Sequence, residues 1–266
     1  MRTSLLLPDL HLGSHDDKAL RIALKICAVV KPQEIVILGD WLDAHAFNSH
    51  GSSDRREAMQ AGYLEEVEWC RELLDYLESF HSVERIVYIE GNHEFRFERW
   101  VVNDGGTFGR EIADTLSPKA LLSVGREKRF TWVPYKTPGK APLIHLAPGI
   151  VACHGLSTAK HAAAVHLTKV PGYSVVHGHT HRQQTHVSRC PVTNRQLVGH
   201  SPGTLAQLQP LWLAGATAWS LGVTLLRVRG QRWALQPISI EEGTAFLPDG
   251  SYLTAGRKGS IIEGVA

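Results

Sequence analysis

Five short segments of the chain combine aspartate, asparagine and histidine side chains, which are typical ligands of divalent metal ions. The segments are Asp9-Leu10-His11, Gly39-Asp40-Trp41-Leu42-Asp43, Gly91-Asn92-His93-Glu94, Cys153-His154-Gly155 and Gly178-His179-Thr180-His181. Carboxylate, amide and imidazole groups suit Mn²⁺, Fe²⁺ and Zn²⁺, and no thiolate is among the candidate ligands. The alternate spacing in Asp9/His11 and His179/His181 projects both side chains the same way from extended backbone. Together the five segments indicate a metal site.

Each of the five segments follows a short apolar run that is typical of a buried strand. Strands are predicted over residues 3–7, 34–38, 85–89, 130–134, 150–153 and 174–176, with further strands inside 183–188 and 218–236. Helices are predicted from Asp16 or Asp17 to about Val30, over 55–80 and over 159–168. This alternation predicts an α/β sheet with helices packed on it. Ligands gather beyond the carboxyl ends of the strands in such sheets, so the five segments should meet at one place.

Each segment taken alone has an ordinary structural explanation. An Asp-x-His triplet is common in surface turns, Gly91-Asn92 fits a turn after a strand, and His154 fits a hydrogen-bonded core histidine. The order of the five segments, each after an apolar run, favours a metal site over these alternatives.

The ordered set resembles the motifs of the calcineurin-like binuclear metallophosphoesterases over about residues 3–182. The resemblance implies an α/β fold in four layers, with two mixed sheets packed face to face and helices outside. It also implies two metal positions that share the bridging carboxylate of Asp40. The other ligands are Asp9, His11 and His181 at the first position and Asn92, His154 and His179 at the second. His93 corresponds to the general acid of the family, and Asp43 to the acidic residue that orients it.

The activity implied by the resemblance is hydrolysis of a phosphate ester. Two ions about 3.5–4 Å apart hold a bridging hydroxide, which attacks phosphorus in line with the leaving group. Bound water becomes acidic enough to supply this hydroxide near neutral pH. His93, held by Asp43, then protonates the leaving oxygen. We expect two divalent ions as cofactors, with manganese first and iron or zinc as alternatives.

The motifs favour a phosphodiester of nucleic acid or nucleotides over a small-molecule phosphomonoester. Protein Ser/Thr phosphatases of this superfamily continue the second motif with Arg-Gly, whereas here Asp43 is followed by Ala44-His45. The Gly-His-Thr-His form of the last motif is similar to that of phosphodiesterases, nucleotide hydrolases and repair nucleases. Arg96 is predicted to bind a substrate phosphate, and the alternative is a salt bridge to Glu94 or Glu98.

Basic residues in the segments around the motifs are numerous enough to follow a nucleic-acid backbone. They are Arg55, Arg56, Arg110, Arg126, Lys128 and Arg129, and the acidic Glu111, Asp114 and Glu127 lie among them. A solvated mixed surface is the alternative explanation. The loop histidines His15, His45 and His50 are either substrate contacts or exposed residues.

The composition limits the class of protein. With 266 residues, of which 43% are hydrophobic and 20% charged, the chain is globular, and a net charge of +2 argues against a DNA-binding protein with a structural metal. Prolines and glycines interrupt the uncharged residues 196–226, so strands and loops are expected there instead of a membrane span. Four widely separated cysteines favour a reducing compartment, the cytoplasm. A single domain is predicted over 1–240, and a loosely packed tail over 241–266.

A second class of function is a non-enzymatic interaction scaffold on the same fold. The presence of all seven ligand positions and of His93 argues against it. The expected partner is a phosphate-ester substrate, with nucleic acid as the favoured source, and the oligomeric state stays open.

Overall fold

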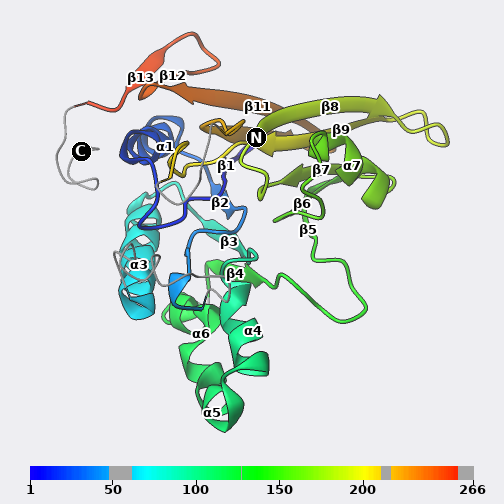
Figure 1. Ribbon diagram of the computed structural model, residues 1–266. Helices are drawn as coiled ribbons and strands as arrows, with labels where there is room; N and C mark the ends of the chain where they lie inside the picture. The colour runs from blue at the N-terminus through cyan, green and yellow to red at the C-terminus, as the bar shows by residue number, and fades with distance from the viewer. Residues whose placement is uncertain (48–61, 127, 211–216, 257–266) are drawn as a thin grey trace.

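The computed structural model describes residues 1–47, 62–126, 128–210 and 217–256 (Figure 1). In this part of the chain, eight strands form the larger sheet: β1 (Arg2–Leu7), β2 (Glu34–Ile37), β3 (Arg85–Ile89), β4 (Phe130–Val133), β10 (Gly222–Arg229), β11 (Arg232–Glu241), β12 (Thr244–Phe246) and β13 (Tyr252–Thr254). Their order is β13-β12-β11-β10-β1-β2-β3-β4. Strands β1 to β4 are parallel, whereas β10 to β13 pair antiparallel, so the sheet is mixed.

The smaller sheet contains five strands of the described residues: β5 (Ile144–Ala147), β6 (Ile150–Cys153), β7 (Ser174–His177), β8 (Gln183–Arg189) and β9 (Gln196–Pro202). Their order is β5-β6-β7-β9-β8. The three central strands are parallel, and β5 and β8 pair antiparallel at the two edges. This sheet is therefore mixed as well.

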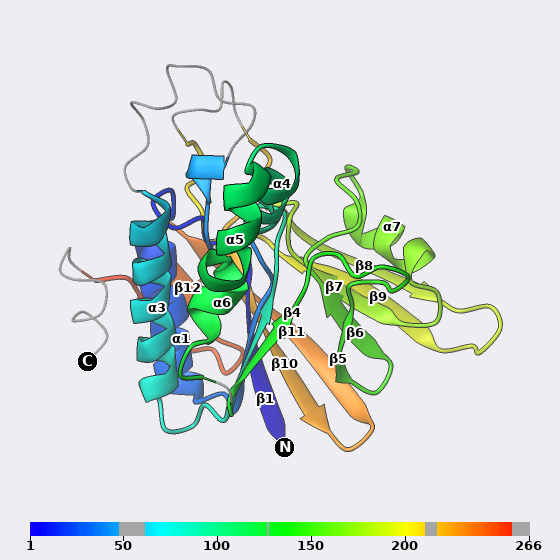
Figure 2. The same ribbon diagram turned by 90° about the horizontal axis from the view of Figure 1, so that it is seen from below.

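Helices cover the outer faces of the two sheets (Figure 2). The helices are α1 (Asp17–Val30), α3 (Tyr63–Ser79), α4 (Phe95–Asn103), α5 (Gly106–Leu116), α6 (Pro118–Ser123) and α7 (Ala162–Lys169), with a short 3₁₀ turn η1 (His45–Phe47). Asp16 directly precedes α1 and caps it, because its side chain accepts a hydrogen bond from the backbone N–H of Ala19. Helices α1 and α3 lie together against the larger sheet, and α7 lies against the smaller one.

Alternating side chains along the central strands divide the apolar interior into separate layers. Leu5 and Leu7 pack in the core shared with α1 and α3, whereas Leu6 packs in the core between the sheets. In β6, Ala152 faces the same inter-sheet core, and Val151 packs in the core shared with α7. Strands buried on both faces are continuous apolar runs, which is the pattern predicted from the sequence. The α/β fold of two mixed sheets flanked by helices, implied by the resemblance, is confirmed.

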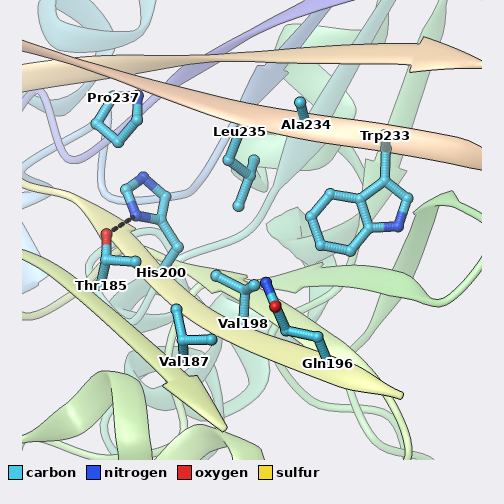
Figure 3. A pocket seen from close by; sticks show the side chains of 9 residues that line it. All are labelled: Thr185, Val187, Gln196, Val198, His200, Trp233, Ala234, Leu235 and Pro237. Atoms are coloured by element: carbon cyan, nitrogen blue, oxygen red, sulfur yellow. Dashed lines mark hydrogen bonds between the residues drawn. The ribbon is translucent and has the colours of Figure 1, made fainter. Parts of the chain in front are cut away.

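A pocket of about 480 Å³ opens between the sheets, where β11 passes over β8 and β9 (Figure 3). The residues that line it are Thr185, Val187, Gln196, Val198, His200, Trp233, Ala234, Leu235 and Pro237. None of the predicted metal ligands belongs to this lining, so the pocket is separate from the candidate site.

The C-terminal segment differs from the expected loosely packed tail. Up to residue 256 it completes β11 and forms β12 and β13, which extend the larger sheet. Ala245 and Leu247 are buried there, with exposures of 1% and 6%. Two short strands are held by backbone pairing and need few large apolar groups, so the composition did not reveal them. Residues 257–266 lie outside the described residues.

Two further predictions concern helix bounds and membrane spans. The helix expected over residues 55–80 is observed as α3, and residues 55–61 lie outside the described part of the chain. Of the helices in the described residues, none has both the length and the apolar character that a bilayer span requires.

Candidate metal centre

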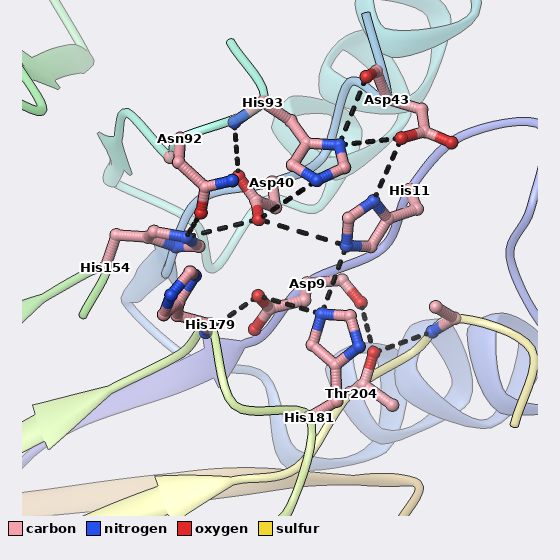
Figure 4. Close-up of polar contacts among 12 residues, drawn as sticks. Asp9, His11, Asp40, Asp43, Asn92, His93, His154, His179, His181 and Thr204 are labelled. Carbon is pink, nitrogen blue, oxygen red and sulfur yellow. Dashed lines mark hydrogen bonds and ion pairs between the residues drawn. The ribbon is translucent and has the colours of Figure 1, made fainter. Parts of the chain in front are cut away.

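The predicted site residues meet beyond the carboxyl ends of strands from both sheets (Figure 4). The end of β1 supplies Asp9 and His11, the end of β2 supplies Asp40 and Asp43, and the end of β3 supplies Asn92 and His93. From the smaller sheet, the end of β6 supplies His154 and the end of β7 supplies His179 and His181. Because neighbouring strands in each set are parallel, their carboxyl ends lie at one edge and bring these side chains together.

The first group of converging donors consists of Asp9, His11, Asp40 and His181, whose ligand atoms lie within 4.8 Å of one another. His181 Nε2 is 3.4 Å from Asp9 Oδ1 and 3.1 Å from His11 Nε2. His11 Nε2 is in turn 3.9 Å from Asp40 Oδ2. Asp9 is fully buried, and its Oδ2 atom has no hydrogen-bond partner among the described residues. A buried carboxylate oxygen is costly without a partner, and a bound cation would satisfy it.

The second group joins Asp40 to His154 and His179, with Asn92 beside them. His154 Nε2 is 3.2 Å from Asp40 Oδ2 and 2.9 Å from Asn92 Oδ1. The other ring nitrogen of His154, Nδ1, donates to the carbonyl oxygen of Leu38 at 2.7 Å. A neutral His154 therefore directs a lone pair from Nε2 at two oxygen atoms, so either a proton or a metal ion must lie among these three acceptors.

The electrostatics of both groups favour a bound cation. Burial alone would lower the pKa of His154, but the adjacent Asp40 carboxylate raises it to about 10. Burial opposes the charged form of His11 as well. Its hydrogen bond to Asp43 and the charges of the neighbouring aspartates outweigh this effect and raise the pKa of His11 to about 9. The opposite shift at His179, whose pKa burial and the neighbouring His154 lower to about 4, leaves a neutral imidazole. In the described residues, the donor set and its charges fit a bound metal ion, and Asp40 belongs to both groups.

Backbone conformation positions several of these side chains. His11, Asp40, His179 and His181 have φ values of 50°, 51°, 68° and 55°. Residues other than glycine rarely adopt positive φ, and such strained conformations cluster at functional sites. Each of these residues therefore lies in a bend of the backbone within four residues of the end of its strand.

The glycines of the motifs allow segments from different strands to approach closely. A Cβ atom on Gly178 would lie 2.6 Å from Asp9 Oδ2, and one on Gly155 would lie 2.6 Å from the Cβ of His179. At Gly91 a Cβ would clash with Asp40. These positions lack a side chain because a candidate ligand from another segment occupies the space.

Glu94 holds two of the ligand segments together, a role that the sequence did not predict. Its carboxylate is fully buried. Oε1 accepts hydrogen bonds from the backbone N–H groups of Trp41 and Leu42 at 2.8 and 3.0 Å and from the hydroxyl of Tyr88 at 2.7 Å. Oε2 accepts from the N–H groups of Asp40 and Gly91 at 3.0 and 2.9 Å. The local signal was the three-residue spacing from Gly91, but the contacts to residues 40–42 are distant in sequence.

Asp43 connects several histidines beside the two groups. Its Oδ1 atom accepts a hydrogen bond from His93 Nδ1 at 2.6 Å and lies 3.4 Å from His11 Nδ1, while its other oxygen pairs with His45. Burial opposes ionisation of Asp43, but the hydrogen bonds from these histidines hold its pKa well below the usual value. Asp43 is thus an ionised carboxylate that fixes the orientation of His93.

The guanidinium of Arg96 forms no ion pair with Glu94 or Glu98 among the described residues, so the salt-bridge alternative is not observed. Its guanidinium instead donates to the backbone oxygen of Asp43 at 2.6 Å and to His93 Nε2 at 2.9 Å. The side chain therefore lies beside the candidate general acid.

The other predicted contact residues differ in their exposure and in their partners. Arg126 is buried and pairs with Asp75 and Glu78 of α3, so it is unavailable to a nucleic-acid backbone. Arg110, Lys128 and Arg129 are exposed. His15 pairs with Asp17 at 3.3 Å, and His45 contacts Asp43 as described above. Arg55, Arg56, Glu127 and His50 lie outside the described residues.

Comparison with known proteins gives structural neighbours of low sequence identity. The sequence matches no known family profile and no curated protein. One neighbour is Vps29 of Entamoeba histolytica in complex with zinc (11% identity, 96% of this chain and 99% of that chain, TM-score 0.47). Others are Vps29 of Chaetomium thermophilum (14%, 95% and 94%, TM-score 0.46) and Yfce, a phosphoesterase of E. coli (15%, 95% and 97%, TM-score 0.35). The neighbours thus include Vps29 proteins and a phosphoesterase, at values too low to assign a function to this chain.

Proposed function

We propose that this protein is a metal-dependent phosphoesterase, and that its substrate is a phosphodiester of nucleic acid or a nucleotide. The observation that supports this is that Asp40 belongs to two converging donor groups. Next to them, His93 is held by a hydrogen bond to the carboxylate of Asp43. A shared carboxylate is suited to two adjacent ions, which is an arrangement used by phosphatases and nucleases. A small-molecule phosphomonoester is the alternative substrate.

Two metal ions are the proposed cofactors, manganese first and iron or zinc as alternatives. Asp9, His11 and His181 would hold one ion, Asn92, His154 and His179 the other, and Asp40 both. When bound, such a pair lowers the pKa of water and neutralises charge on the phosphate oxygens. Buried carboxylates beside neutral or ion-paired imidazoles supply the negative field that retains the cations.

His93 is the proposed general acid. Its Nδ1 atom donates to Asp43, which fixes the ring so that Nε2 lies on the side of the metal groups, 4.0 Å from Asp40 Oδ2. Burial lowers the pKa of His93 although the charge of Asp40 raises it, so the metal-free ring is readily neutral at Nε2. A dianionic transition state near Nε2 would favour the protonated ring, which can then transfer its proton to the leaving oxygen.

Arg96 is the proposed phosphate-binding residue. The guanidinium already lies within hydrogen-bond distance of His93 Nε2, so a phosphate that approaches this atom also approaches Arg96. A planar guanidinium can bind two phosphate oxygens at once. The hydrogen bond from Arg96 to the backbone oxygen of Asp43 would keep the guanidinium oriented while it binds the phosphate.

The proposal is tested with bis(p-nitrophenyl) phosphate and protein loaded with Mn²⁺, Fe²⁺ or Zn²⁺. Wild-type protein should hydrolyse it faster than p-nitrophenyl phosphate, and His93→Ala should lose about 10²–10⁴ in kcat while it retains its metal. His81→Ala, at an exposed histidine, is the matched control. Absence of turnover with every ion on both substrates would contradict the proposal and favour an interaction scaffold.

The proposed compartment is the cytoplasm. Cys27, Cys70, Cys153 and Cys190 all lie in described residues and are free thiols. Burial raises the pKa of the Cys27 thiol to about 12, so this group is inert to oxidation by way of its thiolate. A reducing environment suits these four groups.

A further inference from the structure

An aromatic ring lies beside each of the two donor groups. The indole of Trp219 contacts the His181 ring edge to face, with centroids 4.3 Å apart. The phenol of Tyr135 lies near the His154 ring in a similar orientation, at 6.0 Å. His181 belongs to the first group and His154 to the second. The two rings therefore mark different ends of the candidate metal centre, and both are partly exposed.

The ring of Tyr135 belongs to a small platform that also carries a cation. Phe95, the first residue of α4, lies 5.4 Å from it between centroids. The exposed Lys136 places Nζ 5.0 Å from the Phe95 ring and 5.9 Å from the Tyr135 ring. The backbone N–H of Tyr135 donates to Glu90 Oε2 at 2.7 Å, which fixes the platform relative to the end of β3.

We propose that Trp219 and the Tyr135–Phe95 platform bind the two nucleobases that flank the scissile phosphate. A phosphodiester carries two ester substituents that leave phosphorus in different directions, so a centre with an aromatic ring at each end fits a base on each side. Every base has an aromatic face, and stacking on aromatic side chains is tolerant of sequence. Lys136 lies where a neighbouring phosphate of the same strand would follow the base. This inference rests on the proposed function and specifies its substrate.

Binding of two ligands that differ only in the base gives a direct test. AMP and ribose 5-phosphate share a phosphate and a ribose, and their dissociation constants for the Mn²⁺-loaded protein are measured by calorimetry. AMP should bind about tenfold more tightly, as expected for one stacked base. Tyr135→Leu and Trp219→Leu together should abolish this difference between the two ligands. Equal affinities of the two ligands for the wild-type protein would overturn the proposal.

Conservative variants separate stacking from a loss of structure. Tyr135→Phe and Trp219→Phe retain a ring and should retain the preference for AMP. Tyr252→Leu replaces an exposed tyrosine on β13 and should change neither constant. If Tyr135→Phe and Tyr135→Leu weaken AMP equally, the ring is not the binding element and the platform is refuted.

Kinetics then distinguish a dinucleotide from a longer strand. The kcat/KM for the adenosine dinucleotide should exceed that for the methyl ester of AMP about tenfold, because only the dinucleotide carries a second base. If a ten-nucleotide adenosine strand has a higher kcat/KM than the dinucleotide, and Lys136→Ala removes this difference, the substrate is a strand. If the two kcat/KM values are equal, the substrate is the dinucleotide. Failure of the proposed function would be seen as absent turnover of any ester, whereas failure of this inference would be seen as turnover indifferent to bases.

Discussion

Replacement of Glu94 by glutamine tests whether a buried carboxylate holds the segments of the candidate metal ligands in place. An amide oxygen at the Oε1 position can still accept hydrogen bonds from Trp41, Leu42 and Tyr88. The amide NH₂ would then face the backbone N–H groups of Asp40 and Gly91, which now donate to Oε2. The opposite orientation of the amide loses three acceptor contacts instead of two, so at least two buried hydrogen bonds are lost in either case.

The magnitude follows from these two bonds. A hydrogen bond to a charged group contributes about 1.5–3 kcal/mol, so two of them correspond to about 3–6 kcal/mol in the free energy of unfolding. Burial raises the pKa of Glu94, because the charged carboxylate is costly to bury. Replacement by a neutral amide removes this cost and offsets part of the lost hydrogen-bond energy. We therefore expect a destabilisation near the lower end, about 3 kcal/mol. Asp40 should also move, because its backbone N–H donates to Oε2 and its φ is positive.

Urea denaturation measures the first effect, and elemental analysis of manganese after reconstitution measures the second. Glu98→Gln changes an exposed residue of α4, the helix that begins directly after Glu94, and should stay within about 0.5 kcal/mol of the wild-type protein. The Glu94→Gln variant should also retain less than the full complement of metal. Equal stability of the two variants would refute the inference that Glu94 fixes the backbone of residues 40–42.

Two further predictions concern a close contact and the pH dependence of stability. Gly178→Ala should displace Asp9 Oδ2, which lies 2.6 Å from the new Cβ, and elemental analysis should show loss of the ion proposed to be held by Asp9. Gly62→Ala, where no atom of the described residues lies within 4 Å of the new Cβ, should retain both ions. Two ions in Gly178→Ala would contradict this prediction. In metal-free protein, the pKa of His154 is raised from 6.5 to about 10, so the stability it contributes is complete below pH 6.5 and is lost as the pH rises toward 10. The shift corresponds to on the order of 5 kcal/mol, and urea denaturation from pH 7 to 10 should show this decline in wild-type protein but less in His154→Gln; parallel curves would contradict the assignment.

Much of the fold could be predicted because buried strands leave a clear pattern. Strands β3 and β6 were predicted with the observed bounds, since continuous apolar runs occur where both faces of a strand are covered. Strand β5 was not predicted, because its exposed His145 interrupts the pattern at the edge of the smaller sheet. Strands β12 and β13 depend on backbone pairing, which composition does not record.

The candidate site could be assembled from the sequence only as far as the types and order of its residues. The pattern gives the direction of a side chain on a regular strand, but His11 and Asp40 have already left extended backbone, so their convergence depends on bends that the pattern does not encode. Arg96 was predicted to bind a substrate phosphate, with a salt bridge to Glu94 or Glu98 as the alternative; the sequence could not show that its guanidinium contacts Asp43, 53 residues away. Trp219 and Tyr135 were not recognised, because the sequence does not reveal which histidines their rings contact.

The two-sheet architecture explains why the donor groups form as they do. The first group takes candidate ligands from the ends of β1 and β2 in the larger sheet and from the end of β7 in the smaller sheet. The second takes Asp40 from the larger sheet, and His154 and His179 from the smaller sheet. Because each group spans both sheets, neither sheet alone provides a complete set of ligands. The apolar layer between the sheets sets their spacing, and the geometry of the candidate metal centre therefore depends on the packing of residues such as Leu6 and Ala152. Cations bound there would in turn tie the two sheets together, so that metal binding and sheet packing stabilise each other.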